Sequence, residues 1–228
     1  MSADAAPNIS GKKISLIAVI AVLVYCILIF VPAGTFDYWQ AWAYLAVIFI
    51  PAMLVIAYFF KKDPEFLERR MRYQEKEKPQ QLIQKAAGFI FFIGLLIPGL
   101  DHRFGWSNVP VDAVIAADII VFMGYVLCFL AFKENRYASR TVGIDKGQTV
   151  VTTGPYAIIR HPMYLGAIFL WVLTPVALGS YWALPLFLLL PIAMFYRIKN
   201  EEGLLLKELP GYREYCRKTR HKLIPYVW

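Results

Sequence analysis

Two short polar stretches of this chain carry the residue types that bind charged ligands. The first is QTVVTTGPYAIIRHPMYLG, residues 148–166, and the second is RIKNEE, residues 197–202. In the first stretch Arg160 and His161 are followed at once by a proline, and an apolar segment begins there. A proline in the first turn of a helix costs no hydrogen bond, and the free N–H groups of that turn can face a ligand. The arrangement predicts a cofactor-binding entrance to a pocket embedded in a bilayer.

The second stretch places two acidic residues, Glu201 and Glu202, just beyond another apolar segment. Arg197 lies four residues before Glu201, on the same face of a helix. Taken alone, Arg160 is most simply a cytoplasmic anchor, and Arg197 with Glu201 a pair on a helix surface. Paired acids at a membrane end are harder to explain in that way, because Asp and Glu contribute little to topology and are costly near hydrocarbon.

The composition indicates that the bilayer is the solvent of most of the chain. Of 228 residues, 59% are hydrophobic and 18% charged, against about 45–50% and about 25% in soluble domains. The three cysteines lie far apart, without the spacing of a disulfide framework or a zinc site. We therefore predict no metal. The formal net charge of +8 is explained by topology and by anionic lipid of the inner leaflet, so no nucleic-acid partner is expected.

Six apolar segments predict an all-α integral membrane protein. Four are long enough to cross a bilayer, and two are short and contain Pro175, Pro185 and Pro191. The short pair is separated only by residues 179–181, which predicts a tight helical hairpin, followed by a cytoplasmic C-terminal helix. The segments are residues 14–33, 42–60, 83–100, 113–132, 162–178 and 182–196.

The predicted organisation has two parts. Residues 1–132 form a four-span membrane region with a charged cytoplasmic loop at 61–82, and residues 133–228 form the region that binds the cofactor. The apolar residues of that loop are expected to face the membrane surface; they are Phe66, Leu67, Met71 and Tyr73. Asp118, in the fourth span, is expected to reach the interface with its side chain.

Lysine and arginine set the predicted orientation. If the segments alternate and the N-terminus is cytoplasmic, 23 of the 24 basic residues lie on the cytoplasmic side, and only Arg103 lies on the other. Both termini and the two polar stretches then share the cytoplasmic side. Asp37 and Ser180 lie near the opposite face.

The motifs GPYAIIRHPMYLG and RIKNEEGLLL, with a tail Tyr212-Arg213-Glu214-Tyr215, resemble the isoprenylcysteine carboxyl methyltransferase family, which includes related phospholipid methyltransferases. The resemblance covers roughly residues 134–227. It implies a methyltransferase that uses S-adenosylmethionine (SAM) without a Rossmann domain, and no Gly-x-Gly-x-x-Gly follows a strand-like run here. With the predicted orientation the active site is expected to face the cytoplasm, and the resemblance implies a lipophilic acceptor.

The resemblance also assigns roles to residues. Glu201 takes the cofactor's ammonium, Arg197 faces and binds the acceptor, and Arg197 and Glu202 are the catalytic candidates, with Glu202 as the base for an amine acceptor. The residues expected to bind the cofactor are Gln148, Thr149, Val150, Val151, Tyr156, His161, Pro162, Met163, Tyr164 and Glu201.

Other functions remain open at this point. Leu209-Pro210-Gly211 directly before Tyr212, and residues 134–140, depart from the prenylcysteine enzymes, so the acceptor is a prenylcysteine-like carboxylate or another lipophilic molecule. A phospholipid N-methyltransferase is one alternative. An NADPH-dependent reductase of the sterol-reductase type is another, with Arg136, Arg140 and Lys146 near the cofactor's 2'-phosphate. A non-enzymatic membrane adaptor would lack a polar pocket. The oligomeric state is not predicted.

Overall fold

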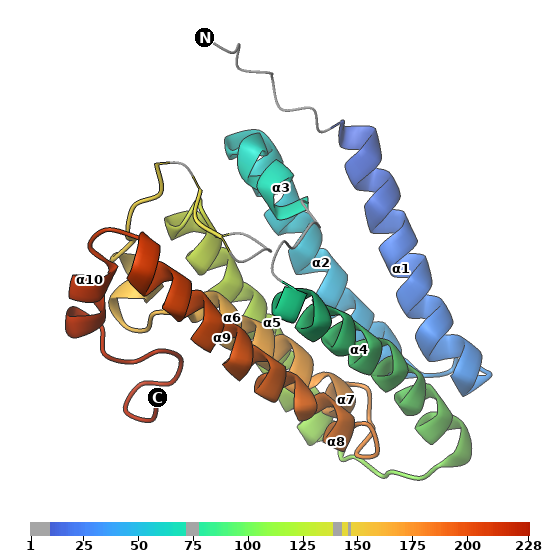
Figure 1. The fold of residues 1–228 in the computed structure, drawn as a ribbon. Coiled ribbons are helices and arrows are strands. Elements are labelled where there is room, and N and C mark those ends of the chain that lie inside the picture. The colour runs from blue at the N-terminus through green and yellow to red at the C-terminus, as the bar shows by residue number, and fades with distance from the viewer. Residues whose placement is uncertain (1–9, 72–77, 139–142, 146) are drawn as a thin grey trace.

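Four long helices form the membrane-embedded body of the protein. The computed structural model describes residues 10–71, 78–138, 143–145 and 147–228, and the regular elements among them are all helical. Four helices are long and apolar enough to cross a membrane: α1 (Gly11–Ala33), α2 (Trp39–Lys62), α4 (Lys78–Phe104) and α5 (Val111–Glu134). The prediction of an all-α integral membrane protein is confirmed (Figure 1).

The remaining helices are short, apart from α9. A helical hairpin runs down through α6 (Pro162–Val172) and α7 (Thr174–Ala177) and back through α8 (Leu184–Phe187) and α9 (Leu189–Glu208). Pro162, Pro175 and Pro185 each stand in the first turn of one of these helices, where a proline is tolerated but ends any preceding helix. The other short elements are α3 (Pro64–Met71), the 3-10 helix η1 (Gly154–Ala157) and α10 (Tyr212–Lys218).

Glycines hold the hairpin against α5. A Cβ added at Gly124 would lie 2.7 Å from the carbonyl oxygen of Gly166, and one added at Gly166 would lie 2.6 Å from Sγ of Cys128. The two helices therefore meet backbone to backbone, as small residues allow in membranes. Since α6 starts with the Arg-His-Pro motif, this contact fixes the motif relative to the fourth span.

A buried carboxylate fixes the tip of the hairpin at the opposite end of the bundle. Asp101, near the end of α4, accepts hydrogen bonds from the backbone N–H and the hydroxyl of Ser107, both at 2.6 Å, and from the hydroxyl of Ser180. The hydroxyl of Tyr38 donates to the carbonyl of Leu178. Because these groups come from α4, the α4–α5 turn, the start of α2 and the α7–α8 turn, the hairpin is held at its tip as well as along α5.

Two side-chain expectations differ from the structure. Phe66 and Leu67 of α3 are buried against protein, with the Phe66 ring 4.5 Å from that of Phe59 and 5.4 Å from that of Phe132. The apolar face of α3 therefore packs on α2 and α5 in place of the membrane surface; Tyr73 lies outside the described residues. Asp118 is buried within the bundle, at 9% exposure, and does not reach the interface.

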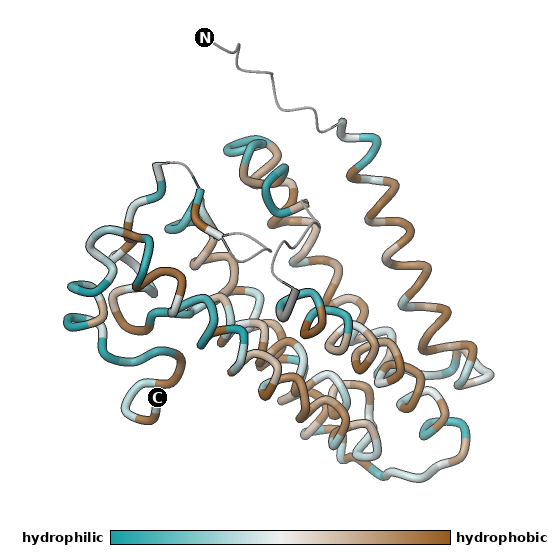
Figure 2. Tube along the Cα trace, in the orientation of Figure 1, coloured by the Kyte–Doolittle hydropathy of each residue, from teal (hydrophilic) through white to brown (hydrophobic). Residues whose placement is uncertain are grey.

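The charged segments gather at one end of the bundle. Figure 2 shows hydrophilic residues at the N-terminal end of α1, the α2–α3 connection, the start of α4, the end of α9 and around α10, with brown apolar helices between the ends. Arg103 lies at the other end of α4, as expected for the one basic residue that the alternating topology places on the opposite side.

The topology makes a prediction that labelling can test. In a cysteine-free background, a cysteine introduced at the exposed Asn108 should react with a membrane-impermeant maleimide added to intact cells. A cysteine introduced at Gln148 should react only after the membrane is permeabilised, because the basic residues place that loop on the cytoplasmic side. The opposite labelling pattern would reverse the orientation.

Candidate cofactor-binding site

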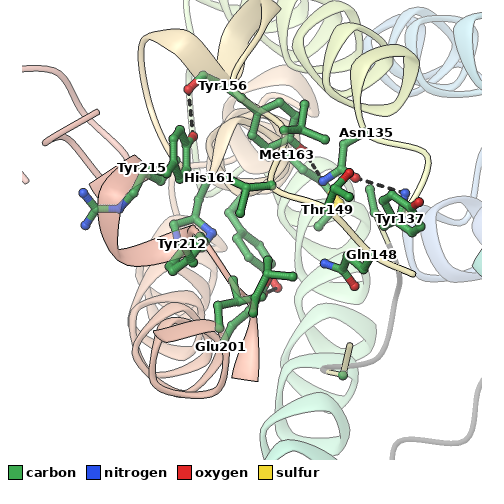
Figure 3. Close-up of a pocket in the computed structure, with 18 residues that line it drawn as sticks. Asn135, Tyr137, Gln148, Thr149, Tyr156, His161, Met163, Glu201, Tyr212 and Tyr215 are labelled. Carbon is green, nitrogen blue, oxygen red and sulfur yellow. Dashed lines mark hydrogen bonds between the residues drawn. The ribbon is translucent and has the colours of Figure 1, made fainter. Parts of the chain in front are cut away.

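A cavity lies at the charged end of the bundle (Figure 3). Its walls come from five places: the chain after α5, the 3-10 helix η1, the start of α6, the end of α9, and α10 with the residues just before it. The cavity is partly open to solvent. Its lining mixes polar, aromatic and aliphatic side chains: Asn135, Tyr137, Ala138, Gly143, Gln148, Thr149, Val150, Val151, Tyr156, Arg160, His161, Met163, Tyr164, Glu201, Leu205, Leu209, Tyr212 and Tyr215.

The cavity brings together nine of the ten residues predicted to bind the cofactor. Gln148 and Thr149 lie across the cavity from Glu201, which projects from α9 (Figure 3), and Val150 and Val151 also line it. The tenth, Pro162, is buried at the start of α6 and does not line the cavity. The two other predicted residues, Arg197 and Glu202, are buried outside the lining.

Hydrogen bonds shape the wall around Tyr156. Asn135 donates from Nδ2 to the hydroxyl of Tyr156 at 3.3 Å, and the hydroxyl of Tyr215 donates to the carbonyl of Tyr156 at 2.7 Å. Burial raises the pKa of both Tyr156 and Tyr215, so their hydroxyls stay protonated at neutral pH. The tail helix α10 is thereby attached to η1 across one side of the cavity.

The Gly-Pro turn before Tyr156 is possible only with glycine. Gly154 has a φ of +55°, and a Cβ there would lie 2.6 Å from Cγ of Glu134. Glu134 needs this close approach, because its Oε2 accepts a hydrogen bond of 2.6 Å from the hydroxyl of Thr153. The end of α5 and the turn are in contact here, which brings residues 148–153 against the bundle.

A hydrogen-bonded series leads from Glu201 away from the cavity. The hydroxyl of Tyr164 donates to Oε2 of Glu201 and accepts from Nε of Arg197 at 3.1 Å. Nη1 of Arg197 donates to Oε1 of Gln80, in α4, also at 3.1 Å. The guanidinium thus lies behind Tyr164, between the cavity and α4.

Glu202 is the centre of a buried ionic cluster. Oε1 accepts from Nε of Arg160 at 2.6 Å and lies 3.3 Å from Nε2 of His161, and Oε2 lies 2.8 Å from Nζ of Lys222. Burial by itself would raise the pKa of Glu202, but the hydrogen bonds from His161, Arg160 and Lys222 together outweigh it and leave that pKa well below its ordinary value. The carboxylate is therefore ionised and fully engaged.

Arg160 extends this cluster to the tail. Its Nη1 donates to the carbonyls of Thr219 and Arg220 at 2.7 and 2.8 Å. The backbone N–H groups of Arg160 and His161 donate to the carbonyls of His221 and Lys222 at 3.0 and 2.9 Å. A solvated topology anchor would make none of these contacts, so Arg160 ties the motif to α9 and to the chain after α10.

Sequence reasoning assigned no role to several residues of the lining. Tyr212 and Tyr215 belong to the tail motif, which was a signal that they lie near the site. Asn135 and Tyr137 follow the fourth span, where the sequence departs from the prenylcysteine enzymes, and no spacing pointed to them. Leu205 and Leu209 follow the acidic pair at intervals of about one helical turn, which would place them on the face of Glu201. The residues that were missed are Asn135, Tyr137, Ala138, Gly143, Leu205, Leu209, Tyr212 and Tyr215; Arg160 was placed at the entrance but not among the residues that bind the cofactor.

The fold and the cavity define a helical membrane protein with a partly polar cavity at one end of its bundle. Residues 114–207 match the model of the Isoprenylcysteine carboxyl methyltransferase (ICMT) family. That range contains the fourth span, the Arg-His-Pro motif, the hairpin and the acidic pair. The resemblance seen in the sequence motifs is confirmed by this match, which covers residues 114–207.

Three curated proteins are similar over part of the chain. The nickel-cobalt-cadmium resistance protein NccN of Alcaligenes xylosoxydans xylosoxydans is 34% identical over 137 residues, and the cobalt-zinc-cadmium resistance protein CzcN of Cupriavidus metallidurans is 28% identical over 134. Each match covers 52% of this chain and 62% of the relative. The Delta(14)-sterol reductase TM7SF2 of Mus musculus is 26% identical over 105 residues, which are 42% of this chain and 25% of that protein.

A solved structure is also similar, that of the eukaryotic intramembrane Ras methyltransferase ICMT. The TM-score is 0.47 at 18% sequence identity, with 96% of this chain and 88% of that chain covered.

The Glu202 cluster predicts a large stability effect. Glu202→Gln should lower the free energy of unfolding by about 3–5 kcal/mol, because it leaves the buried Arg160 without its counter-charge. Thermal or denaturant unfolding in detergent would measure the loss. Glu208→Gln is the control, since Glu208 is exposed on the same helix and should change little. Equal stability of the two variants would contradict the role given to Glu202.

The pH dependence of the unfolding temperature provides a second test of the Glu202 cluster. A carboxylate with a depressed pKa in the folded state stabilises the protein above its unfolded-state pKa, which is about 4.3 for Glu, and this contribution is lost as the pH falls toward the folded-state value. The unfolding temperature of the wild type should therefore fall on acidification below about pH 4.3, and more steeply than that of Glu202→Gln.

Proposed function

We propose that this protein is a SAM-dependent methyltransferase of the membrane, which transfers a methyl group to a lipophilic acceptor. One observation carries the proposal: residues from the polar stretch 148–151, from the Arg-His-Pro motif and from the acidic pair line a single cavity. The match to the ICMT family over residues 114–207 supports the same reaction class.

The lining suits the parts of SAM. Glu201 offers a carboxylate to the ammonium of the amino-acid end, and Val150, Val151, Leu205 and Leu209 offer an apolar surface to the adenine. Buried Tyr212 has a hydroxyl without a hydrogen-bond partner. Since buried polar groups are rarely left unpaired, this hydroxyl is available to a ligand.

The chain's contribution to methyl transfer is to position the reactants. SAM supplies a methyl carbon already activated by its sulfonium, so the protein must hold acceptor, methyl and sulfur in line and exclude water. In this proposal Arg197 orients the acceptor, because a guanidinium binds an oxyanion through two parallel hydrogen bonds. A carboxylate acceptor needs no base, and Glu202, held by three basic groups, supports the site in place of acting as one.

A reductase is the second candidate, because a sterol reductase is among the similar proteins. Its cofactor's 2'-phosphate would require basic groups that are free to bind it. Arg136 pairs with Glu65 at 3.6 Å and does not line the cavity, while Arg140 and Lys146 lie outside the described residues. Calorimetric titration with S-adenosylhomocysteine and with NADPH separates the two enzymes, and binding of neither would favour an adaptor.

The first prediction from the proposal concerns the cofactor. Glu201→Gln keeps the size of the side chain and removes its charge, so it should weaken binding of S-adenosylhomocysteine by about ten- to a hundredfold. Isothermal titration calorimetry on purified protein measures this change, with Glu208→Gln as a charge-matched control on the same helix. Wild-type affinity in Glu201→Gln would remove Glu201 from the cofactor site.

The second prediction concerns the acceptor. Arg197→Lys should keep the affinity for S-adenosylhomocysteine nearly unchanged and lower turnover of a lipophilic acceptor strongly, because a lysine cannot reproduce the planar fork. Methyl transfer from radiolabelled SAM is the measurement. The control is Lys199→Arg, an exchange of the same two residue types at an exposed position of α9. If Arg197→Lys turns over like the wild type, Arg197 serves only as a positive charge.

A further inference from the structure

Gln80 is a buried polar residue that the function described so far does not use. It lies near the start of α4 and is only 1% exposed. It precedes residues 114–207, so it is outside the region that matches the family. No motif pointed to it.

The Gln80 amide has one satisfied end and one unsatisfied end. Oε1 accepts the hydrogen bond from Nη1 of Arg197, and Nε2 has no hydrogen-bond partner. The guanidinium of Arg197 carries only donors, so the amide oxygen, not the nitrogen, must face it. The unpartnered group is therefore the NH₂, which donates two hydrogen bonds and accepts none.

The position of this NH₂ connects it to the proposed acceptor subsite. From the cavity, Glu201 is joined through Tyr164 to Arg197, and Arg197 to Gln80. A buried donor without a partner is costly, and native proteins contain few of them. Here it stands beside the one guanidinium expected to meet the acceptor.

We infer that Gln80 is a specificity-determining residue of the acceptor subsite, whose amide NH₂ donates to an oxygen of the acceptor beside the guanidinium of Arg197. This rests on the proposed function and narrows it. Two neighbouring donors, one of them cationic, suit a carboxylate and repel an amine that is protonated in solution. Gln80 would therefore favour the carboxylate that the family's name implies over the amine of a phospholipid headgroup.

The reaction this implies is balanced without further groups. An oxygen of the acceptor carboxylate bonds to the methyl carbon, the carbon–sulfur bond breaks, and its electron pair passes to sulfur. The products are a methyl ester and S-adenosylhomocysteine. No proton is transferred, which agrees with a site in which Glu202, the candidate base for an amine acceptor, is already engaged by three basic groups.

Two substitutions separate a contact with the acceptor from support of Arg197. Gln80→Glu keeps the oxygen that Arg197 needs but removes the donor and adds a negative charge. Gln80→Met keeps the volume and removes both polar functions. If Gln80 only holds Arg197, the Glu variant behaves like the wild type and the Met variant does not; if its NH₂ binds the acceptor, both variants are impaired.

The test measures methyl transfer from radiolabelled SAM by the purified full chain, with N-acetyl-S-farnesylcysteine as carboxylate probe and phosphatidylethanolamine as amine probe. The wild type should methylate the carboxylate. Gln80→Glu and Gln80→Met should raise KM for it by about tenfold or more, since an unpaired polar group at a recognition site discriminates strongly, with affinity for S-adenosylhomocysteine unchanged. Gln40→Met should leave KM unchanged, because Gln40 also has an unpartnered buried amide atom but lies at the other end of the bundle, near Gly179.

Each other outcome overturns a defined part of the argument. A wild-type KM in Gln80→Glu limits Gln80 to support of Arg197, and methylation of the amine probe alone, or of neither probe, rejects the carboxylate subsite while cofactor binding stands. Failure of the wild type to bind S-adenosylhomocysteine rejects the proposed function itself. Unfolding temperatures of the Gln80 variants, measured alongside, should stay near the wild-type value; a collapse together with lost cofactor binding would mean that Gln80 is a packing residue, against the inference.

Discussion

The buried ion pair between Arg160 and Glu202 is the interaction on which the site depends. Two opposite charges removed from water are tolerated only when their remaining hydrogen-bonding groups are also satisfied. Here Nη1 of Arg160 donates to two backbone carbonyls after α10, and the second oxygen of Glu202 pairs with Lys222. The requirement to satisfy one pair therefore draws together the start of α6, the end of α9 and the tail, which are three walls of the cavity.

The other walls depend on the N-terminal half of the chain. α5 meets α6 at Gly124 and Gly166, and its end carries Glu134 and Asn135 against the Gly-Pro turn and Tyr156. α4 contributes Gln80 to Arg197. The division at residue 132 stays a prediction. The residues that line the cavity all follow it, but Gly124 and Gln80, which precede it, contact the elements that carry the lining.

Much of this arrangement could be predicted from the sequence, for identifiable reasons. Uninterrupted apolar runs predicted the four spans, since a bilayer requires about 20 such residues. The prolines in the two short apolar segments predicted a hairpin of interrupted helices. The polar stretch 148–151 and the Arg-His-Pro motif were predicted to bind one ligand, and they line one cavity. Gln80 and Asn135 could not be found in this way, because their importance comes from long-range contacts with α9 and η1, not from any local pattern. The segment of α3 was predicted to lie on the membrane surface because it is charged and has few apolar residues. The sequence does not show that Phe66 packs between Phe59 of α2 and Phe132 of α5.

Glu201 and Glu202 show why a motif alone does not assign roles. Adjacent residues of an α-helix project about 100° apart, given 3.6 residues per turn, so one carboxylate of the pair cannot share the other's surroundings. Glu201 points to the cavity, where its hydrogen bond from Tyr164 orients it and leaves it available to a cation. Glu202 points to Arg160 and the tail, where three basic groups occupy it. From the sequence, both were candidates for a role in binding or catalysis. In the structure only Glu201 lines the cavity, and Glu202 belongs to the buried ionic cluster. The proposed site depends on both, because the ionic cluster around Glu202 fixes the end of α9 from which Glu201 projects.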